Sequence, residues 1–147
     1  DQAEVVRQLK LDHYVEGNPW ASKKRQVGGL LGHILQPDDL GLRDESLERL
    51  NVRWTDDKDV CVLFYEDKVR AVVTRRHNAV TSRGLKVQSG IGALKEHYKD
   101  GQTDWKKLDL DGGGHIEIYR YDTLGIGFEV QDGSISSITL CPSSAGK

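Results

Sequence analysis

The stretch Gly125-Ile126-Gly127-Phe128-Glu129-Val130-Gln131-Asp132-Gly133-Ser134-Ile135-Ser136-Ser137-Ile138 decides the fold class of this chain. Apolar residues recur at alternate positions on both sides of a short polar segment, Gln131 to Gly133. This pattern predicts two antiparallel strands, 125–130 and 134–140, joined by a tight turn. A further alternating segment, 115–121, precedes them and extends the hairpin to a three-stranded meander.

A helix is predicted directly upstream of this meander, over residues 89–99. Ile91, Leu94 and Tyr98 form an apolar stripe at helical spacing, and Asp100-Gly101 ends it. Ser89 is expected to cap the helix N-terminus. A helix followed by antiparallel strands indicates the α+β class rather than a parallel βαβ sheet.

The first half of the chain carries a similar order of elements. Segments 60–65 and 69–74 predict a second hairpin, and the polar residues 66–68 form its turn. Segment 60–65 is apolar on both faces, so it is expected to be a central strand covered on both sides. A short helix is predicted over 44–50, and an amphipathic one over 3–11.

The two halves can be superimposed in sequence at an offset of about 66 residues. We therefore predict two degenerate helix-plus-antiparallel-strand repeats, about 26–76 and 84–141, which share one antiparallel sheet. The whole chain, 1–147, is expected to form a single domain. A unit of about 70 residues is marginal alone, so a shared core is expected.

The second half resembles one unit of a known superfamily. The entry segment Gly84-Leu85-Lys86-Val87-Gln88-Ser89-Gly90-Ile91, the aromatic Tyr121 and the strand that begins at Gly125 carry the likeness. This superfamily holds the β-lactamase-inhibitory protein and small outer-membrane assembly lipoproteins. The resemblance covers about half of the chain, since Gly28 to Gly32 matches the entry segment only loosely. It implies the repeat fold and a non-enzymatic binding role, and it marks no inhibitory or catalytic residue.

Composition and charge restrict the function classes. The net charge is −2, from 21 basic and 23 acidic residues, which argues against a dedicated nucleic-acid binder. No apolar stretch approaches the roughly 18 residues of a membrane span. The chain begins at Asp1 and contains no Met, which indicates that its native start has been removed. Cys61 and Cys141 can form one disulfide, but the sequence does not require it.

Residue spacing reveals no catalytic or metal-binding motif, so we expect no enzyme activity and no cofactor. The five histidines lie too far apart for a zinc motif, and no Gly-x-Ser-x-Gly segment presents a nucleophile. Asp109 to Ile116 is similar to a calcium loop, but Arg120 stands where a bidentate carboxylate is required. Leu124 to Phe128 resembles the carboxylate-binding loop of PDZ domains, yet too little chain follows it to complete that fold.

The leading hypothesis is a non-enzymatic protein-interaction or structural module. The alternative is a small-molecule or metal-binding domain, conceivably a minor enzyme, whose site no motif reveals. Alternation places Ile116, Ile118, Phe128 and their neighbours on the core face of the last three strands. On the opposite face we predict a partner-binding site, with tyrosines as anchors and carboxylates that orient the partner: Tyr119, Tyr121, Glu117 and Glu129.

Overall fold

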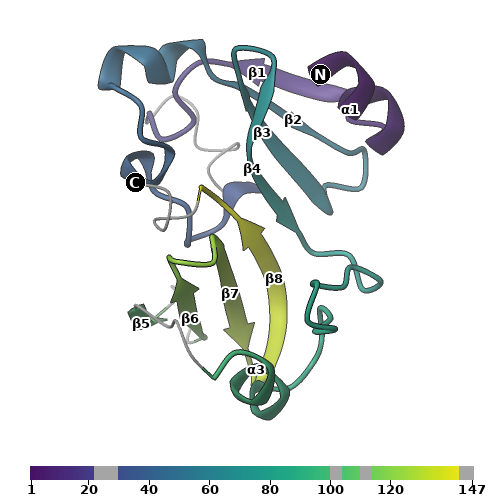
Figure 1. Ribbon diagram of the computed structural model, residues 1–147, viewed down its shortest axis with the longest axis vertical. Helices are drawn as coiled ribbons and strands as arrows, with labels where there is room; N and C mark the ends of the chain where they lie inside the picture. The colour runs from purple at the N-terminus through teal and green to yellow at the C-terminus, as the bar shows by residue number, and fades with distance from the viewer. Residues whose placement is uncertain (22–29, 100–103, 110–113, 143–147) are drawn as a thin grey trace. The chain divides into compact units, whose positions relative to one another are not determined.

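A computed structural model describes residues 1–21, 30–99, 104–109 and 114–142, the side chains of 104–109 excepted. The chain divides into two compact units, Asp1–Val73 and Thr74–Lys147. In each unit an α-helix, α1 or α3, precedes antiparallel strands (Figure 1), so the predicted α+β class is confirmed. The prediction of a single domain with a shared core stays a prediction.

Unit 1 has its strands in the order β1-β2-β3-β4, each antiparallel to its neighbour where the register is known. A long segment with two short 3-10 helices separates the first two strands. The predicted helix over 44–50 is one of these, so it is helical but not an α-helix. The elements are α1 (Gln2–Leu9), β1 (His13–Glu16), η2 (Pro37–Leu40), η3 (Asp44–Arg49), β2 (Asn51–Trp54), β3 (Val60–Tyr65) and β4 (Lys68–Thr74).

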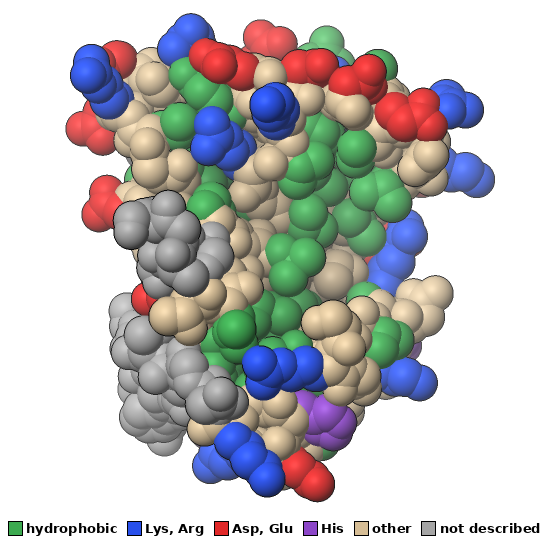
Figure 2. Space-filling model, in the orientation of Figure 1, with side chains coloured by type: hydrophobic (Ala, Val, Ile, Leu, Met, Phe, Trp, Pro, Cys, Tyr) green, Lys and Arg blue, Asp and Glu red, His purple; other side chains and the backbone are tan. Residues whose placement is uncertain are grey.

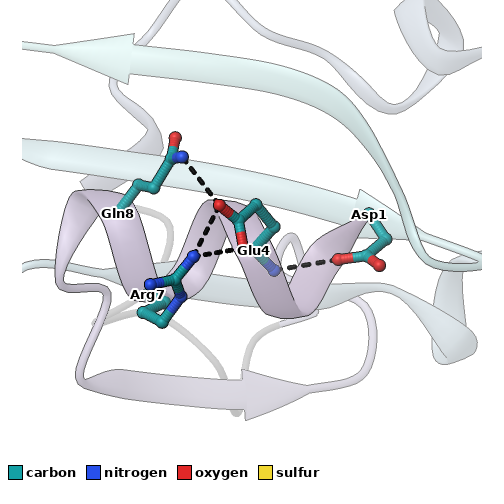
Figure 3. Close-up of polar contacts among 4 residues, drawn as sticks. All are labelled: Asp1, Glu4, Arg7 and Gln8. Atoms are coloured by element: carbon teal, nitrogen blue, oxygen red, sulfur yellow. Dashed lines mark hydrogen bonds and ion pairs between the residues drawn. The ribbon is translucent and has the colours of Figure 1, made fainter.

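Side chains at its own surface stabilise α1 (Figure 3). The Asp1 carboxylate caps the N-terminus by accepting a hydrogen bond from the Glu4 backbone N–H at 2.9 Å. Glu4 in turn accepts hydrogen bonds from Arg7 and Gln8, each 2.7 Å from Oε1. Lys10 ends the helix in the left-handed conformation. These local bonds fix a helix that buries none of its residues completely.

The core beneath α1 is small. Val5 and Val6 of the helix are half-buried and pack against buried apolar residues, together with Val72 of β4. All six residues of β3 are buried, and β3 lies between β2 and β4. The prediction that this segment is a central strand covered on both sides is therefore confirmed. The buried residues of this cluster are Leu11, Val60, Val62 and Phe64.

Unit 2 also has an α-helix before four strands. Its helix, α3 (Ile91–His97), is followed by strands in the order β5-β6-β7-β8, antiparallel throughout. The meander predicted over 115–140 is confirmed. The strands are β5 (Asp104–Asp109), β6 (His115–Tyr121), β7 (Ile126–Gln131) and β8 (Ser134–Leu140).

The cap of α3 differs from the predicted one. Gly90, not Ser89, is the N-cap residue, and it makes no side-chain hydrogen bond. The Ser89 hydroxyl accepts a bond from the Lys86 backbone N–H at 3.2 Å, so it closes the turn before the helix. The helix N-terminus is held by the neighbouring hairpin instead, because the Ile91 N–H donates to the Gly133 carbonyl at 2.9 Å.

Both hairpins close through two-residue turns with positive φ at both positions. In unit 1, Glu66 and Asp67 have φ of 51° and 70°. In unit 2, Asp132 and Gly133 have φ of 54° and 79°. Positive φ at both positions is the requirement of a type I′ turn, whose twist matches that of the strands.

The core beneath α3 in unit 2 is rich in aromatic residues. Tyr98, Tyr121 and Phe128 pack with ring centroids 5.1 to 5.9 Å apart in tilted or edge-to-face geometry. Leu94 of α3 is fully buried against them. The remaining buried members are Leu85, Val87, Tyr119, Ile126, Val130, Ile135 and Ile138.

Within the described residues, no helix combines the length and the apolar character needed to cross a membrane. Basic and acidic side chains intermingle on the face drawn in Figure 2, which fits the near balance of charge in the sequence.

Candidate functional site

The four residues predicted to bind a partner lie on β6 and β7. Tyr119 and Tyr121 are 4% and 1% exposed and belong to the core of unit 2. Glu129 is buried, and Glu117 is half-buried. We predicted an exposed face with tyrosines on the side opposite the core. This prediction is wrong, because both tyrosines are buried in the core.

The error concerns the phase of one strand relative to the next. Residues directly opposite each other in an antiparallel pair share a face. Tyr119 lies opposite Phe128, and Tyr121 lies opposite Ile126, so the tyrosines share the core face with Phe128. Alternation within each strand was sufficient to separate two faces, but it could not show which face of β6 continues onto β7.

Buried hydrogen bonds hold the predicted residues in place. The Tyr119 hydroxyl donates to Glu117 Oε2 at 2.7 Å, and the Ser137 hydroxyl donates to Glu129 Oε2 at 3.0 Å. Burial raises the pKa of Tyr121 above its ordinary value, and the nearby Tyr98 adds to the rise while Arg83 opposes it. The two tyrosines thus pack in the core, and the two glutamates accept hydrogen bonds from neighbouring side chains.

A different set of aromatic and cationic side chains lies at the surface of unit 1, on β1 and β2. We call this set the edge surface, because β1 is the last strand of its sheet. Its members are paired across the two strands: His13 lies opposite Trp54, and Tyr14 lies opposite Arg53. Its four residues are His13, Tyr14, Arg53 and Trp54.

Tyr14 and Arg53 form the centre of the edge surface. Tyr14 is 59% exposed, the most exposed large hydrophobic side chain among the described residues. The Arg53 guanidinium lies 4.5 Å from the centroid of the Tyr14 ring, within the range of a cation–π contact. Arg53 Nε also donates to Asn51 Oδ1 at 2.7 Å, and Gln2 Nε2 donates to the same oxygen at 2.7 Å. Arg53 is thus held in one position by α1 and β2.

His13 and Trp54 lie on the other face of the same two strands, because side chains alternate along a strand. Their rings stack with centroids 5.9 Å apart and an interplanar angle of 16°. His13 Nε2 lies 3.0 Å from Asp56 Oδ1, and both side chains are largely exposed. The two contacts therefore occupy opposite faces of the β1–β2 pair, with Tyr14 and Arg53 on one face and His13 and Trp54 on the other.

The backbone of β1 presents unpaired groups beside these side chains. The Gly17 N–H donates to the Leu50 carbonyl at 2.9 Å, so residue 17 faces β2. Hydrogen bonding alternates along an antiparallel strand, so Val15 and His13 also face β2, while Tyr14 and Glu16 direct their N–H and C=O groups away from it. In the part of the chain that the structure describes, no backbone group pairs with that outer side of β1.

Acidic side chains flank the edge surface. Asp12 and Glu16 are exposed at the two ends of β1, and Asp56 is exposed near the end of β2. Arg53 also borders a groove of about 410 Å³ that α1 forms with the hairpin turn, lined in addition by Gln2, Ala3, Val6 and Asp67. A ligand on the edge surface therefore meets an aromatic centre with acidic ends.

Unit 2 has a groove of its own, at the junction of β7, β8 and the segment before α3. It has a volume of about 300 Å³ and a mainly polar lining, which includes Arg75, His77 and Asp132. Gln88 Nε2 lies 3.2 Å from His77 Nε2. This polar groove fits the alternative hypothesis, in which the chain binds a small molecule.

Metal ligands do not gather in the described residues, where no three His, Cys, Asp or Glu side chains lie close enough to hold an ion. The calcium-like segment from Asp109 to Ile116 is described only in part, because residues 110–113 lie outside the described ranges. The segment that resembles a PDZ loop leads into β7 through Gly125–Phe128. The backbone of β7 pairs with β6 on one side and with β8 on the other.

The sequence contained a signal for the edge surface that was missed. His13-Tyr14-Val15-Glu16 and Asn51-Val52-Arg53-Trp54 both alternate partly between polar and apolar residues, as strands do. Each is only four residues long, and more than thirty residues separate them. Their pairing could not be read from local pattern.

Comparison with protein-family models, with curated proteins and with solved structures finds no match to this chain.

Proposed function

We propose that this chain is a non-enzymatic protein-interaction module, and that it binds an extended segment of a partner protein along β1. One observation carries the proposal: among the described residues Tyr14 is the most exposed aromatic side chain, and it lies on an edge strand whose outer backbone groups pair with none of those residues. An added strand would satisfy the outward N–H and C=O groups of Tyr14 and Glu16. The backbone would supply affinity, and side chains would supply selectivity.

Tyr14 and Arg53 are the proposed anchors. Tyrosine and arginine are the residue types enriched at interface hot spots, where they bury a large area and keep a polar group. The contact between the two side chains, and the hydrogen bonds that hold Arg53 to Asn51, support this role because they order Arg53 before a partner arrives. Preordered side chains lose less conformational entropy on binding.

The charge around β1 favours a basic partner segment. Asp12 and Glu16 are exposed at its two ends, so a lysine or arginine opposite either of them would be attracted. A second copy of this chain is a poorer occupant. Antiparallel self-pairing centred on Tyr14 would place Asp12 of one copy opposite Glu16 of the other, and like charges directly opposite are destabilising.

The tandem-repeat hypothesis belongs to the same proposal. Each unit has a helix before a four-stranded meander, and in each unit the N-terminus of that helix is hydrogen-bonded to the turn of the last hairpin. These features support two degenerate copies and the resemblance to the superfamily of the β-lactamase-inhibitory protein. They match α1, rather than the segment 44–50, with α3.

Affinity capture from the native host tests the proposal. The bait is the wild-type chain, beside a Tyr14→Ala, Arg53→Gln double variant and a matched control, Leu124→Ala, which removes an exposed apolar side chain from unit 2. We expect the double variant to lose its specific partner, with an affinity roughly 30-fold lower, or about 2 kcal/mol. The control should retain it.

A partner retained by the double variant would contradict the proposal. A Glu117→Gln bait in the same series examines the sequence-based hypothesis on Tyr119, Tyr121, Glu117 and Glu129. It alters the most accessible of the four side chains without emptying the core. If only this bait loses the partner, the sequence-based site is supported and the edge surface is not.

A further inference from the structure

The polar groove of unit 2 is lined by segments that lie far apart in the sequence. All of its residues belong to Thr74–Lys147, and its volume is about 300 Å³. Arg75 and His77 come from the segment after β4, and Gln88 comes from the segment before α3. Asp132 comes from the turn between β7 and β8. Because these side chains border one cavity, a molecule inside it meets both a guanidinium and a carboxylate.

The groove has an apolar base and polar walls. Val87 and Ile135 line it and belong to the buried core of unit 2, so they form its base. Gln131 and Ser134 line it as well, and their side chains make no hydrogen bond with the described residues. Hydrogen-bonding groups placed around an apolar base are typical of small-molecule sites.

The backbone of Gln88 is strained beside the groove. Its φ is 76°, in the left-handed region that residues with a Cβ rarely adopt. Two hydrogen bonds to β8 hold it there: the Gln88 N–H donates to the Ile135 carbonyl at 2.7 Å, and the Ile135 N–H donates to the Ser89 carbonyl at 2.8 Å. In this conformation Gln88 Nε2 lies 3.2 Å from His77 Nε2. Strained residues cluster at ligand-binding positions, where the surrounding structure enforces them.

Arg75 and Asp132 give the groove opposite charges that do not neutralise each other. The exposed Asp132 carboxylate forms no ion pair or hydrogen bond with the described part of the chain, so Arg75 is not its partner. Asp132 would repel a simple anion, and Arg75 would repel a simple cation. A zwitterion suits both, because its carboxylate accepts hydrogen bonds from a guanidinium and its ammonium donates them to a carboxylate.

We infer that this groove binds a small zwitterion, such as an amino acid, that carries one carboxylate and one ammonium group. Arg75 binds the carboxylate, and Asp132 binds the ammonium group. Gln88 is a positioning residue, because its hydrogen bond fixes His77 at the wall of the groove. The site lies in unit 2 and is independent of the strand-binding function proposed for β1.

The test is a titration of the full chain with glycine, β-alanine and γ-aminobutyrate at constant ionic strength, followed by backbone amide chemical shifts. These three zwitterions differ in the distance between their charges. Butyrate and butylamine carry one charge each and are the comparison ligands. We expect saturable shifts at Gln88, Asp132 and Ser134, with at least one zwitterion binding roughly tenfold more tightly than butyrate or butylamine.

Single variants separate the two charges. Asp132→Asn keeps the turn, since asparagine tolerates positive φ, and it should weaken zwitterion binding to the level of butyrate. Arg75→Gln should weaken it to the level of butylamine. The matched control is a Lys86→Gln, Glu96→Gln double variant, which removes the same two charges from exposed positions outside the groove. It should bind as the wild type does.

Gln88→Gly distinguishes a role in binding from a role in stability. Glycine adopts positive φ without strain, so this variant should keep or raise the Tm while it weakens zwitterion binding several-fold. Equal binding of the zwitterions, butyrate and butylamine would overturn the inference. The absence of a saturable shift with any zwitterion, or unaltered binding in Asp132→Asn, would overturn it as well.

Discussion

Both units place an α-helix before four antiparallel strands, but they place their aromatic residues differently. In unit 2 the rings of Tyr98, Tyr121 and Phe128 form the centre of the core beneath α3. In unit 1 the aromatic contacts of Tyr14 and Trp54 are with Arg53 and His13 at the surface. Among the described residues, the cluster beneath α1 contains one buried ring, that of Phe64. In unit 2 these aromatic residues stabilise the core, whereas in unit 1 Tyr14 is largely exposed and Trp54 is half-buried.

The largest effect should come from emptying the aromatic core. Phe128 is fully buried and contacts two other rings. We expect Phe128→Ala to cost about 3–5 kcal/mol of unfolding free energy, from lost transfer energy and the cavity left behind. Val6→Ala, on the half-buried face of α1, should lower the unfolding free energy by about 1 kcal/mol. Urea unfolding of both variants measures the difference, and equal losses would show that the cores do not differ as described.

A smaller effect is expected from the hydrogen bond that joins helix and hairpin, because its acceptor differs between the two units. In unit 1 the Gln2 N–H donates to a side chain, Asp67 Oδ1, at 3.1 Å, whereas in unit 2 the acceptor is the Gly133 backbone carbonyl. Asp67→Ala should therefore destabilise α1 by about 1–2 kcal/mol, while Asp67→Asn retains the acceptor oxygen and tolerates positive φ. Amide hydrogen exchange across α1 measures this loss. Faster exchange in the asparagine variant alone would be inconsistent with this account.

The hairpins and the central strand were predicted from the sequence because their signals are local. Asp132-Gly133 is a type I′ pair, and the continuous apolar run of β3 marks a strand covered on both faces. The phase between β6 and β7 is set by long-range pairing, so the burial of Tyr119 and Tyr121 was not predictable from alternation. The edge surface was missed for the same reason, since β1 finds β2 across residues 17–50.

The raised pKa of Tyr121 should appear as a loss of stability in alkali. In the unfolded chain the phenol ionises near its ordinary pKa of 10.0, whereas burial keeps it protonated in the folded chain. The unfolded state then binds fewer protons, so the unfolding free energy is intact below pH 10 and falls as pH rises toward the folded pKa. Chemical unfolding from pH 9 upward should show a steeper decline for the wild type than for Tyr121→Phe. Parallel declines would exclude this contribution.

The smallest expected effect concerns the turn of unit 1. Glu66 has a φ of 51°, which is costly for a glutamate, and its exposed side chain forms no hydrogen bond or ion pair with the described residues. Asparagine tolerates this conformation, so Glu66→Asn should stabilise the chain by about 0.5 kcal/mol. Thermal unfolding against the wild type measures the gain. Destabilisation instead would mean that Glu66 has a role the turn does not explain.

The claim that a partner strand adds to β1 is tested most directly by one backbone change at Glu16. Its N–H points away from β2, so Glu16→Pro removes a donor to the partner without breaking the β1–β2 ladder. Glu16→Ala removes the same carboxylate but keeps the N–H, and both variants are measured for affinity to the captured partner. The account predicts that the proline variant binds at least tenfold more weakly than the alanine variant while both melt cooperatively. Equal affinity of the two variants would contradict strand addition at β1.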